Sequence, residues 1–233
     1  MIPSDSHSGA DGRGRLLITA GPTHEPIDAV RYIANRSSGR LGVALADEAD
    51  ERGWRVTLLL GPTNTAPTHP GVRLVRFKST ADLEAALIEH LPACDVLVMA
   101  AAVADYRPTI SESDLDSKRR RTGENMILEL SPTPDLLAGC SSRSRDNQLI
   151  VGFALEPRAE MIESARKKLA RKKIDLVVAN PLETMDSDQI EATIIGREGT
   201  GLEEGRSTPG AIAKTDFAAW LLGVLEETAC ASR

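Results

Sequence analysis

Short apolar runs alternate with longer amphipathic segments along most of the chain. The runs are typical of strands buried on both faces, and the amphipathic segments repeat apolar residues three and four positions apart, which is the spacing of one helix face. Leu41, Leu45 and Ala49 illustrate this helical spacing. We expect strands at 16–20, 54–60, 72–77, 95–102, 126–130, 149–153 and 174–179.

This alternation predicts an α/β fold, with a Rossmann-like, doubly wound and mainly parallel sheet that carries helices on both faces. Weak alternation over 190–195, followed by several glycines, predicts a C-terminal hairpin arm. Thr208-Pro209 is expected to open the last helix. In such a sheet, ligands bind at the loops that follow the carboxyl ends of the strands.

Composition and charge narrow the class of protein. The 233 residues are 41% hydrophobic and only 3% aromatic, so Leu, Val, Ile and Ala must fill the core. The net charge of −6 argues against sequence-independent nucleic-acid binding, because such binding needs a broad cationic surface. No apolar run has transmembrane length, and the first 15 residues lack the apolar centre of a signal peptide. We expect a cytoplasmic protein with a disordered leader at 1–14 and a single domain at 15–233.

The three cysteines lie far apart, at Cys94, Cys140 and Cys230. They form no CxxC motif and share no zinc-ligand spacing with histidines. Reduced thiols in the cytosol and the absence of a dedicated metal cage are therefore expected.

Polar residues and glycines follow the first strand. Residues 21–42 read GPTHEPIDAVRYIANRSSGRLG and lead into a helix. Small residues at a helix start let a phosphate approach backbone N–H groups, where the helix dipole also favours an anion. Ser37, Gly39 and Gly42 are candidates for such a site. The alternative is a capped helix whose glycines serve close packing.

Arg31 and Asn35 come just before this turn. Their spacing of four would place both side chains on one side of a locally helical segment. A guanidinium can hold a carboxylate or phosphate through two hydrogen bonds, and a neutral amide can stabilise a developing oxyanion. Hydrogen bonding within the loop is the alternative.

A second polar segment ends the strand at 95–102. Ala101 and Ala102 are small enough for a ligand to lie against the backbone, and Asp105 could hydrogen-bond a hydroxyl or an amide. An ordinary turn would also explain the Asp. Because both polar segments follow strands of one sheet, we expect them to converge at one edge.

Basic side chains gather in two places. Residues 109–124 contain almost no apolar side chain, which predicts a mobile flap, and the flap carries a basic run from Lys118 to Arg121. This run could close over a triphosphate and neutralise departing pyrophosphate. Lys168 and Lys172 share one face of a later helix. Solvent-exposed charge is the alternative in both places.

Together these segments resemble the phosphopantothenate–cysteine ligase family, in a stand-alone form without the decarboxylase module. The resemblance implies a ligase of coenzyme A biosynthesis that joins 4′-phosphopantothenate to L-cysteine through an acyl-nucleotide intermediate. It implies CTP as co-substrate, with ATP as the alternative, and Mg²⁺ bridging the phosphates. It is carried by 18–42, by AAVADYR at 101–107, by Lys118, by PDLL at 134–137, by VGFA at 151–154, and by Lys168 and Lys172 before Asp175.

The resemblance also implies partners. A homodimer is expected, formed in part by an arm at about 181–207, together with a separate phosphopantothenoylcysteine decarboxylase. Neither flavin nor decarboxylase activity is expected in this polypeptide, because only a short leader precedes the first strand. Neither a nucleic acid nor a membrane is expected as a partner.

The resemblance assigns residue roles. Asn35 would help convert the acyl-nucleotide, Arg31 would reach substrate in the neighbouring subunit, and Lys118 would act from the flap. Other positions would bind ligand: Ser37, Gly39 and Gly42 at the phosphates, Ala101, Ala102 and Asp105 at the pantothenoyl arm, Lys168 and Lys172 near the nucleotide phosphates, and Pro134, Asp135, Leu136, Leu137 and Phe153 around the base.

The chain departs from the family pattern at several positions. Arginines follow Lys118 where the family shows Lys-x-Lys-Lys, which leaves the roles of Arg120 and Arg121 open. Thr133 stands where Asn usually precedes Pro-Asp. Leu155 and Pro157 stand in a stretch that usually reads Ala-Glu-Thr, so the shape of the base pocket is also open.

Two rival functions stay open from the sequence. A dinucleotide-dependent oxidoreductase is disfavoured because no GxGxxG follows the first strand, and NAD(P)H binding would test it. A nucleotide-binding module without turnover would bind CTP but release no pyrophosphate.

Overall fold

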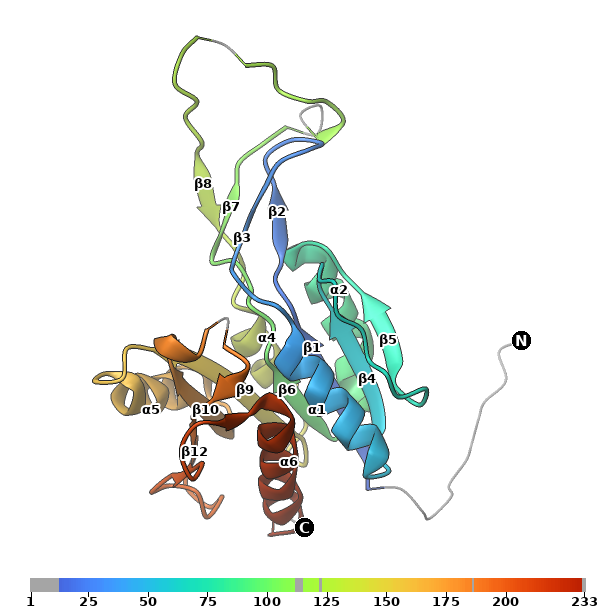
Figure 1. Ribbon diagram of the computed structural model, residues 1–233, viewed down its shortest axis with the longest axis vertical. Helices are drawn as coiled ribbons and strands as arrows, with labels where there is room; N and C mark the ends of the chain where they lie inside the picture. The colour runs from blue at the N-terminus through green and yellow to red at the C-terminus, as the bar shows by residue number, and fades with distance from the viewer. Residues whose placement is uncertain (1–12, 112–114, 122, 186, 232–233) are drawn as a thin grey trace.

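An eight-stranded sheet forms the centre of the molecule in the computed structural model, which describes residues 13–111, 115–121, 123–185 and 187–231 (Figure 1). The predicted leader at 1–14 therefore falls almost entirely outside the described residues. From edge to edge the strands are β13 (Arg206–Ser207), β12 (Thr193–Gly196), β10 (Leu176–Pro181), β9 (Leu149–Glu156), β6 (Val96–Met99), β1 (Arg15–Ala20), β4 (Arg55–Leu60) and β5 (Arg73–Arg76).

The strands from β10 to β5 pair in parallel, and β12 and β13 add an antiparallel edge. The predicted α/β architecture with a mainly parallel sheet is therefore confirmed. The predicted C-terminal hairpin is formed by β12 and β13. It lies in the sheet itself, where Ile194 and Ile195 are buried.

Helices cover both faces of the sheet. Side chains along each strand alternate between the two faces, and here both faces are apolar. Leu16 and Ile18 point into one core cluster and Leu17 into the other. The first cluster includes α1 (Arg40–Glu51) and α6 (Lys214–Ala231), and the second includes α2 (Thr80–His90), α4 (Leu136–Arg143) and α5 (Met161–Lys172). Two short 3₁₀ helices, η1 (Leu91–Ala93) and η2 (Leu182–Thr184), follow α2 and β10. No helix among the described residues is both long and apolar enough to cross a membrane.

Local signals account for some helix boundaries and not for others. Ser79 caps α2 in a capping box with Asp82. The prediction that Thr208 opens the last helix is wrong. The N–H of Thr208 donates to the Ala192 carbonyl, and β14 (Ile212–Ala213) pairs with β11 (Gln189–Ile190), so α6 begins only at Lys214.

Two strand pairs project beyond the carboxyl end of the sheet (Figure 1). The loop after β1 forms the antiparallel pair β2 (His24–Pro26) and β3 (Tyr32–Ala34). The loop after β6 leads to a second pair, β7 (Tyr106–Pro108) and β8 (Leu130–Pro132). We call the described residues of 24–34 and 106–132 the projection.

The projection contains the expected flap at 109–124, of which residues 112–114 and 122 lie outside the description. The strand predicted at 126–130 is shifted. Pairing with β7 begins at Leu130, opposite Pro108, and Met126 and Ile127 are exposed before it.

Candidate functional site

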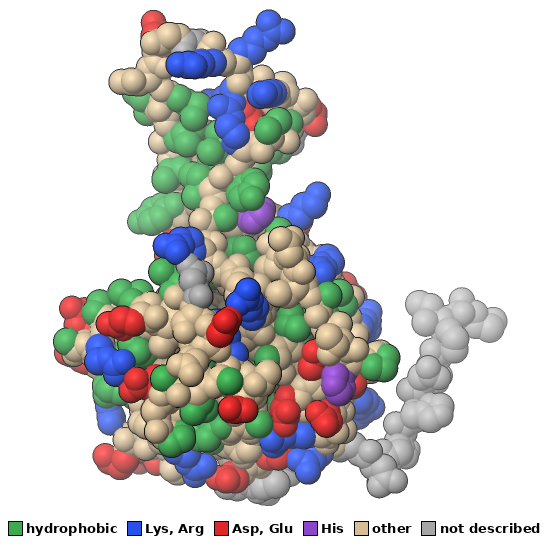
Figure 2. All heavy atoms as spheres, in the orientation of Figure 1, with side chains coloured by type: hydrophobic (Ala, Val, Ile, Leu, Met, Phe, Trp, Pro, Cys, Tyr) green, Lys and Arg blue, Asp and Glu red, His purple; other side chains and the backbone are tan. Residues whose placement is uncertain are grey.

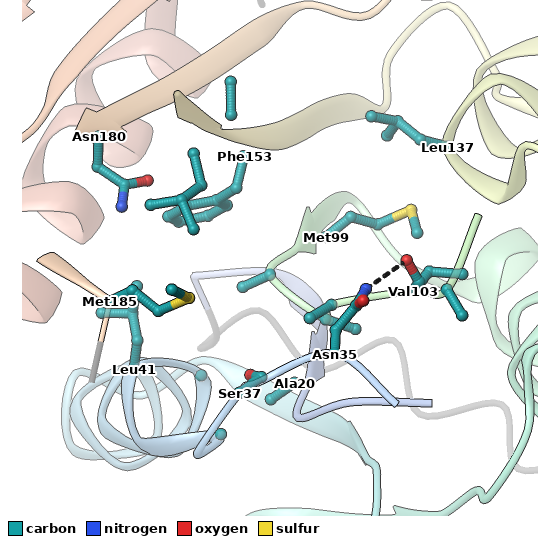
Figure 3. A pocket seen from close by; sticks show the side chains of 18 of the residues that line it. Ala20, Asn35, Ser37, Leu41, Met99, Val103, Leu137, Phe153, Asn180 and Met185 are labelled. Atoms are coloured by element: carbon teal, nitrogen blue, oxygen red, sulfur yellow. Dashed lines mark hydrogen bonds between the residues drawn. The ribbon is translucent and has the colours of Figure 1, made fainter. Parts of the chain in front are cut away.

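A cavity of about 960 Å³ opens at the carboxyl ends of the parallel strands. Its walls come from the segments that follow β1 and β6, from the carboxyl-terminal parts of β9 and β10, and from the first turns of α1 and α4 (Figure 3). The structure thus brings together most of the predicted site. The predicted residues that line the cavity are Asn35, Ser37, Gly39, Gly42, Ala101, Ala102, Asp105, Pro134, Asp135, Leu136, Leu137, Phe153, Lys168 and Lys172.

The first turn of α1 forms one wall. Gly39 is its N-cap residue and has a φ of 73°, a left-handed conformation that glycine adopts without strain. Gly39 has no side chain to cap this terminus, and the Arg40 N–H makes only a long hydrogen bond of 3.5 Å to the Ser38 hydroxyl. An anion could therefore bind the backbone N–H groups here, and the helix dipole also favours it.

Gly42 lets α1 lie directly on β1. A Cβ atom at this position would lie 2.3 Å from the Cβ of Ala20, far inside van der Waals contact. Gly42 therefore serves close packing, which was the alternative explanation, and it also lines the cavity.

Asn35 ties the two polar segments together. Its amide nitrogen donates a hydrogen bond of 2.9 Å to the carbonyl of Val103 (Figure 3). The Ala101 N–H donates to the hydroxyl of Thr19 (3.1 Å), and the Ala104 N–H donates to the hydroxyl of Thr23 (3.0 Å). The expected convergence of the segments after β1 and β6 is thereby observed.

The lysines of α5 reach the cavity from the opposite side. The Lys168 ammonium donates to the Phe153 carbonyl, and burial, reinforced by repulsion from Lys172, lowers the pKa of Lys168 to about 8. Lys172 donates to Asp135 at 3.0 Å. Burial by itself would raise the pKa of Asp135, but the Ala138 N–H and the Lys172 ammonium outweigh it and lower that pKa.

Arg31 and Lys118 lie on the projection and do not line the cavity. The expectation that Arg31 and Asn35 share a helical face is wrong, because the residues between them form strand β3. The Arg31 guanidinium donates to Asp28 and to the Arg119 carbonyl. Lys118 is exposed next to Arg119, as are Arg120 and Arg121.

Sequence reasoning missed Asn180, which is only 8% exposed and lines the cavity at the end of β10. Its amide nitrogen donates to the Thr184 hydroxyl at 2.8 Å, and Figure 3 shows its side chain beside Phe153. A polar residue directly after the predicted strand at 174–179 was the available signal. Met185 and Lys214 also line this side.

The departures from the family pattern have defined positions. The Thr133 hydroxyl donates to the Ala104 carbonyl at 2.5 Å, so this residue fastens the segment before α4 to the Asp105 loop. Leu155 is partly exposed in the cavity wall, beside Phe153. Among the residues that the structure describes, no group of three or more His, Cys, Asp or Glu side chains could hold a metal ion.

Comparison with known proteins gives a consistent set of relatives. The model of the family described as DNA/pantothenate metabolism flavoprotein C-terminal domain matches residues 12–225. A prokaryotic protein named cysteine/cysteine sulfinic acid decarboxylase is 44% identical over 168 residues, which are 72% of this chain and 46% of that protein. The coenzyme A biosynthesis bifunctional protein CoaBC of Mycobacterium tuberculosis is 40% identical over 207 residues, which are 83% of this chain and 49% of that protein.

The chain thus spans about half the length of these curated relatives. Among solved structures, the C-terminal domain of the coenzyme A biosynthesis bifunctional protein CoaBC aligns with a TM-score of 0.76 and 34% identity. That alignment covers 94% of this chain and 97% of the solved chain.

Proposed function

The chain belongs to the DNA/pantothenate metabolism flavoprotein C-terminal domain family, and on that premise we propose that it is a phosphopantothenate–cysteine ligase of coenzyme A biosynthesis. One observation carries the proposal. The start of α1, whose N-cap residue is a glycine, and the Asn35 amide share a cavity with Lys168 and Lys172. Backbone donors for an anion, a neutral amide and two ammonium groups suit the making and breaking of an acyl-phosphate bond.

The proposed reaction has two steps. In the first, a carboxylate oxygen of 4′-phosphopantothenate attacks the α-phosphorus of a nucleoside triphosphate, and pyrophosphate leaves. In the second, the amine nitrogen of L-cysteine attacks the acyl carbon, the nucleoside monophosphate leaves, and the amine gives up a proton. The activation is needed because a free carboxylate is a poor acyl donor to an amine.

Each wall of the cavity has a proposed role. The N–H groups at Ser37, Gly39 and Gly42 bind phosphate, and Ala101, Ala102 and Asp105 hold the pantothenoyl arm. Asn35 donates to the acyl oxygen as negative charge develops on it. Around the base lie Pro134, Asp135, Leu136, Leu137 and Phe153, with Asn180 beside them.

We propose CTP as the co-substrate, with ATP as the alternative. Mg²⁺ would accompany the triphosphate, since this ion commonly binds phosphate oxygens and keeps several of its waters. Asp105 and Glu156 are carboxylates in the cavity wall, whereas Asp135 is already paired with Lys172. The ion would neutralise charge at the phosphates. We assign it no set of ligands made up of protein side chains alone.

The projection suggests how Arg31 and Lys118 reach a substrate. Exposed apolar side chains collect on it, which is typical of a surface that another protein covers (Figure 2). We propose a homodimer in which each projection packs on the other subunit and brings Arg31 and Lys118 to that subunit's cavity. The apolar residues concerned are Val30, Tyr32, Tyr106, Met126, Ile127 and Leu130.

The expected arm at 181–207 is a weaker candidate for the dimer contact, because its Ile194 and Ile195 are buried in the core of the subunit. A cytoplasmic location and a separate decarboxylase as metabolic partner belong to the same proposal.

Pyrophosphate release tests the ligase. The purified chain is incubated with Mg²⁺ and 4′-phosphopantothenate, with CTP or ATP, and with or without cysteine. Release with CTP, and amide product once cysteine is added, is the expected result. Release with ATP but not with CTP would support the proposed reaction and contradict the choice of CTP as co-substrate. Binding of CTP by the folded protein without any release would instead support a module that lacks turnover.

A further inference from the structure

A buried carboxylate at the end of the projection has no part in the proposed chemistry. Asp28 is only 3% exposed. Its Oδ1 atom accepts hydrogen bonds from the N–H groups of Val30 and Arg31, both at 2.8 Å. These two bonds alone would make Asp28 an ordinary turn residue between β2 and β3.

The second carboxylate oxygen does more than close the turn. Oδ2 accepts from the Arg31 guanidinium, with Nε at 2.9 Å and Nη2 also in contact. It also accepts from the Arg119 N–H at 3.1 Å, across 91 residues of sequence. The Arg31 guanidinium, reinforced by these N–H donors, holds the pKa of Asp28 well below its usual range, so the carboxylate is charged at neutral pH.

Further bonds join the same two segments on either side of Lys118. Arg31 Nη2 donates to the Arg119 carbonyl at 2.8 Å, and the Ala29 N–H donates to the Ser117 carbonyl at 3.1 Å. Lys118 is thus bracketed by residues that are bonded to the turn between β2 and β3. The third guanidinium nitrogen, Nη1, takes no part in these contacts, and the Lys118 side chain is exposed.

We propose that Asp28 is a positioning residue that locks Arg31 and Lys118 into one cationic unit, so that both reach an anionic substrate together. The proposal rests on the proposed function, in which these two cations act on the reaction. Asp28 itself touches no substrate. It sets the direction of the guanidinium and holds the 117–119 segment against the turn, so two cations on segments far apart in sequence keep a fixed separation.

Asp28→Asn is the direct test, because an amide keeps the shape of the side chain but puts a donor where Oδ2 accepts three bonds. Hydrogen exchange measures the lock without any need for activity. We expect the Ala29 amide, which is bonded to Ser117 and not to Asp28, to exchange at least tenfold faster in this variant. Unchanged exchange at Ala29 would overturn the lock. Glu163→Gln, which removes an exposed ion pair with Lys167, is the matched control.

Steady-state kinetics then test whether Asp28 acts through the cations. Asp28→Asn should lower kcat for pyrophosphate release at least tenfold in the wild-type background. In a background that already carries Arg31→Gln and Lys118→Gln, Asp28→Asn should lower kcat less than twofold, because the cations that Asp28 positions are already gone. A full, independent loss in both backgrounds would overturn the proposal.

The two claims can fail separately. If the wild-type chain releases no pyrophosphate, the proposed function fails, while the exchange experiment still decides whether the lock exists. If Asp28→Asn does not fold, Arg31→Lys tests the same lock, since an ammonium cannot bond to both Asp28 and the Arg119 carbonyl in the guanidinium geometry. Faster exchange at Ala29 is again the expected result, and unchanged exchange again contradicts the lock.

Discussion

The amide nitrogen of Asn35 lies 2.9 Å from the carbonyl oxygen of Val103, so a side chain from the loop after β1 is fixed by the loop after β6. A primary amide carries two N–H donors, and this bond uses one of them. The orientation that Val103 imposes leaves the second donor for an oxygen in the cavity. Asn35 is therefore held ready before a ligand arrives, which is the arrangement that stabilises a developing charge at least cost.

Asn35→Asp should separate the two steps of the reaction. The carboxylate loses both donors and repels negative charge on the acyl oxygen, so amide formation should fall by about 10²–10³-fold. Pyrophosphate release in the absence of cysteine should stay within about threefold of wild type. Product analysis with labelled cysteine measures the first quantity, and Asn147→Asp, at an exposed position, is the control. Normal amide formation by Asn35→Asp would contradict the assignment.

Lys168 should make nucleotide binding depend on pH. Burial lowers its pKa to about 8, so the ammonium that we propose attracts phosphate is lost as the pH rises through that value. We expect Kd for CTP to be lowest below pH 7 and to rise by about tenfold by pH 9, the scale of one hydrogen bond to a charged group. Calorimetry at pH 6.5, 7.5 and 9 measures this.

Lys168→Arg serves as the control for that experiment. A guanidinium stays charged throughout the range, so the rise in Kd should largely disappear. An identical pH profile in the arginine variant would show that another group titrates.

Gly42→Ala should be strongly destabilising, because its methyl group would lie 2.3 Å from the Cβ of Ala20 on β1. We expect a loss of about 1–3 kcal/mol in the free energy of unfolding, typical of overpacking, together with weaker nucleotide binding as α1 is pushed outward. Urea unfolding measures the change. Gly223→Ala in α6 is the control, since its methyl group meets nothing within 4 Å and should stabilise the protein by about 0.5–1 kcal/mol. Equal changes in the free energy of unfolding for Gly42→Ala and Gly223→Ala would contradict a clash between α1 and β1 as the cause.

Ile127→Ser tests the proposed dimer. This side chain is 89% exposed on the projection, and replacing it should raise the dimer dissociation constant by at least tenfold without lowering the thermal stability of the subunit. Ile88→Ser, at a 52% exposed position on α2, should leave the dissociation constant unchanged. Sedimentation equilibrium measures both. A dimer that is equally weakened by both substitutions, or by neither, would argue against the projection as the interface.

The cavity was predictable because its walls follow buried strands. Apolar runs marked β1 and β6, and the rule that parallel strands end at one edge placed Asn35 and Ala101 in one site. The prediction for Arg31 failed for an equally physical reason. A spacing of four implies a shared face only in a helix, and here His24 pairs with Ala34 in a β-hairpin. Nothing in the local sequence near Arg31 reveals that pairing.

Long-range contacts explain the other differences. The position of Asn180 in the cavity follows from β10 lying beside β9, which a single sequence does not specify. The delayed start of α6 follows from the Thr208 N–H pairing with Ala192 instead of entering a helix. The hydrogen bond that the Arg119 N–H donates to Asp28 spans 91 residues, and no local sequence pattern indicates it.

The order of the strands has a consequence for synthesis of the protein. β6 lies in the middle of the sheet, yet its neighbour β9 begins only at Leu149. The core cluster that contains Val96 and Val98 also includes α6, near the end of the chain. A nascent chain that has emerged through residue 148 therefore presents β6 as an open edge, with the apolar side chains of Val96 and Val98 not yet covered. Such edges pair readily with other chains. During translation this protein should depend on a holding chaperone until its last third has left the ribosome.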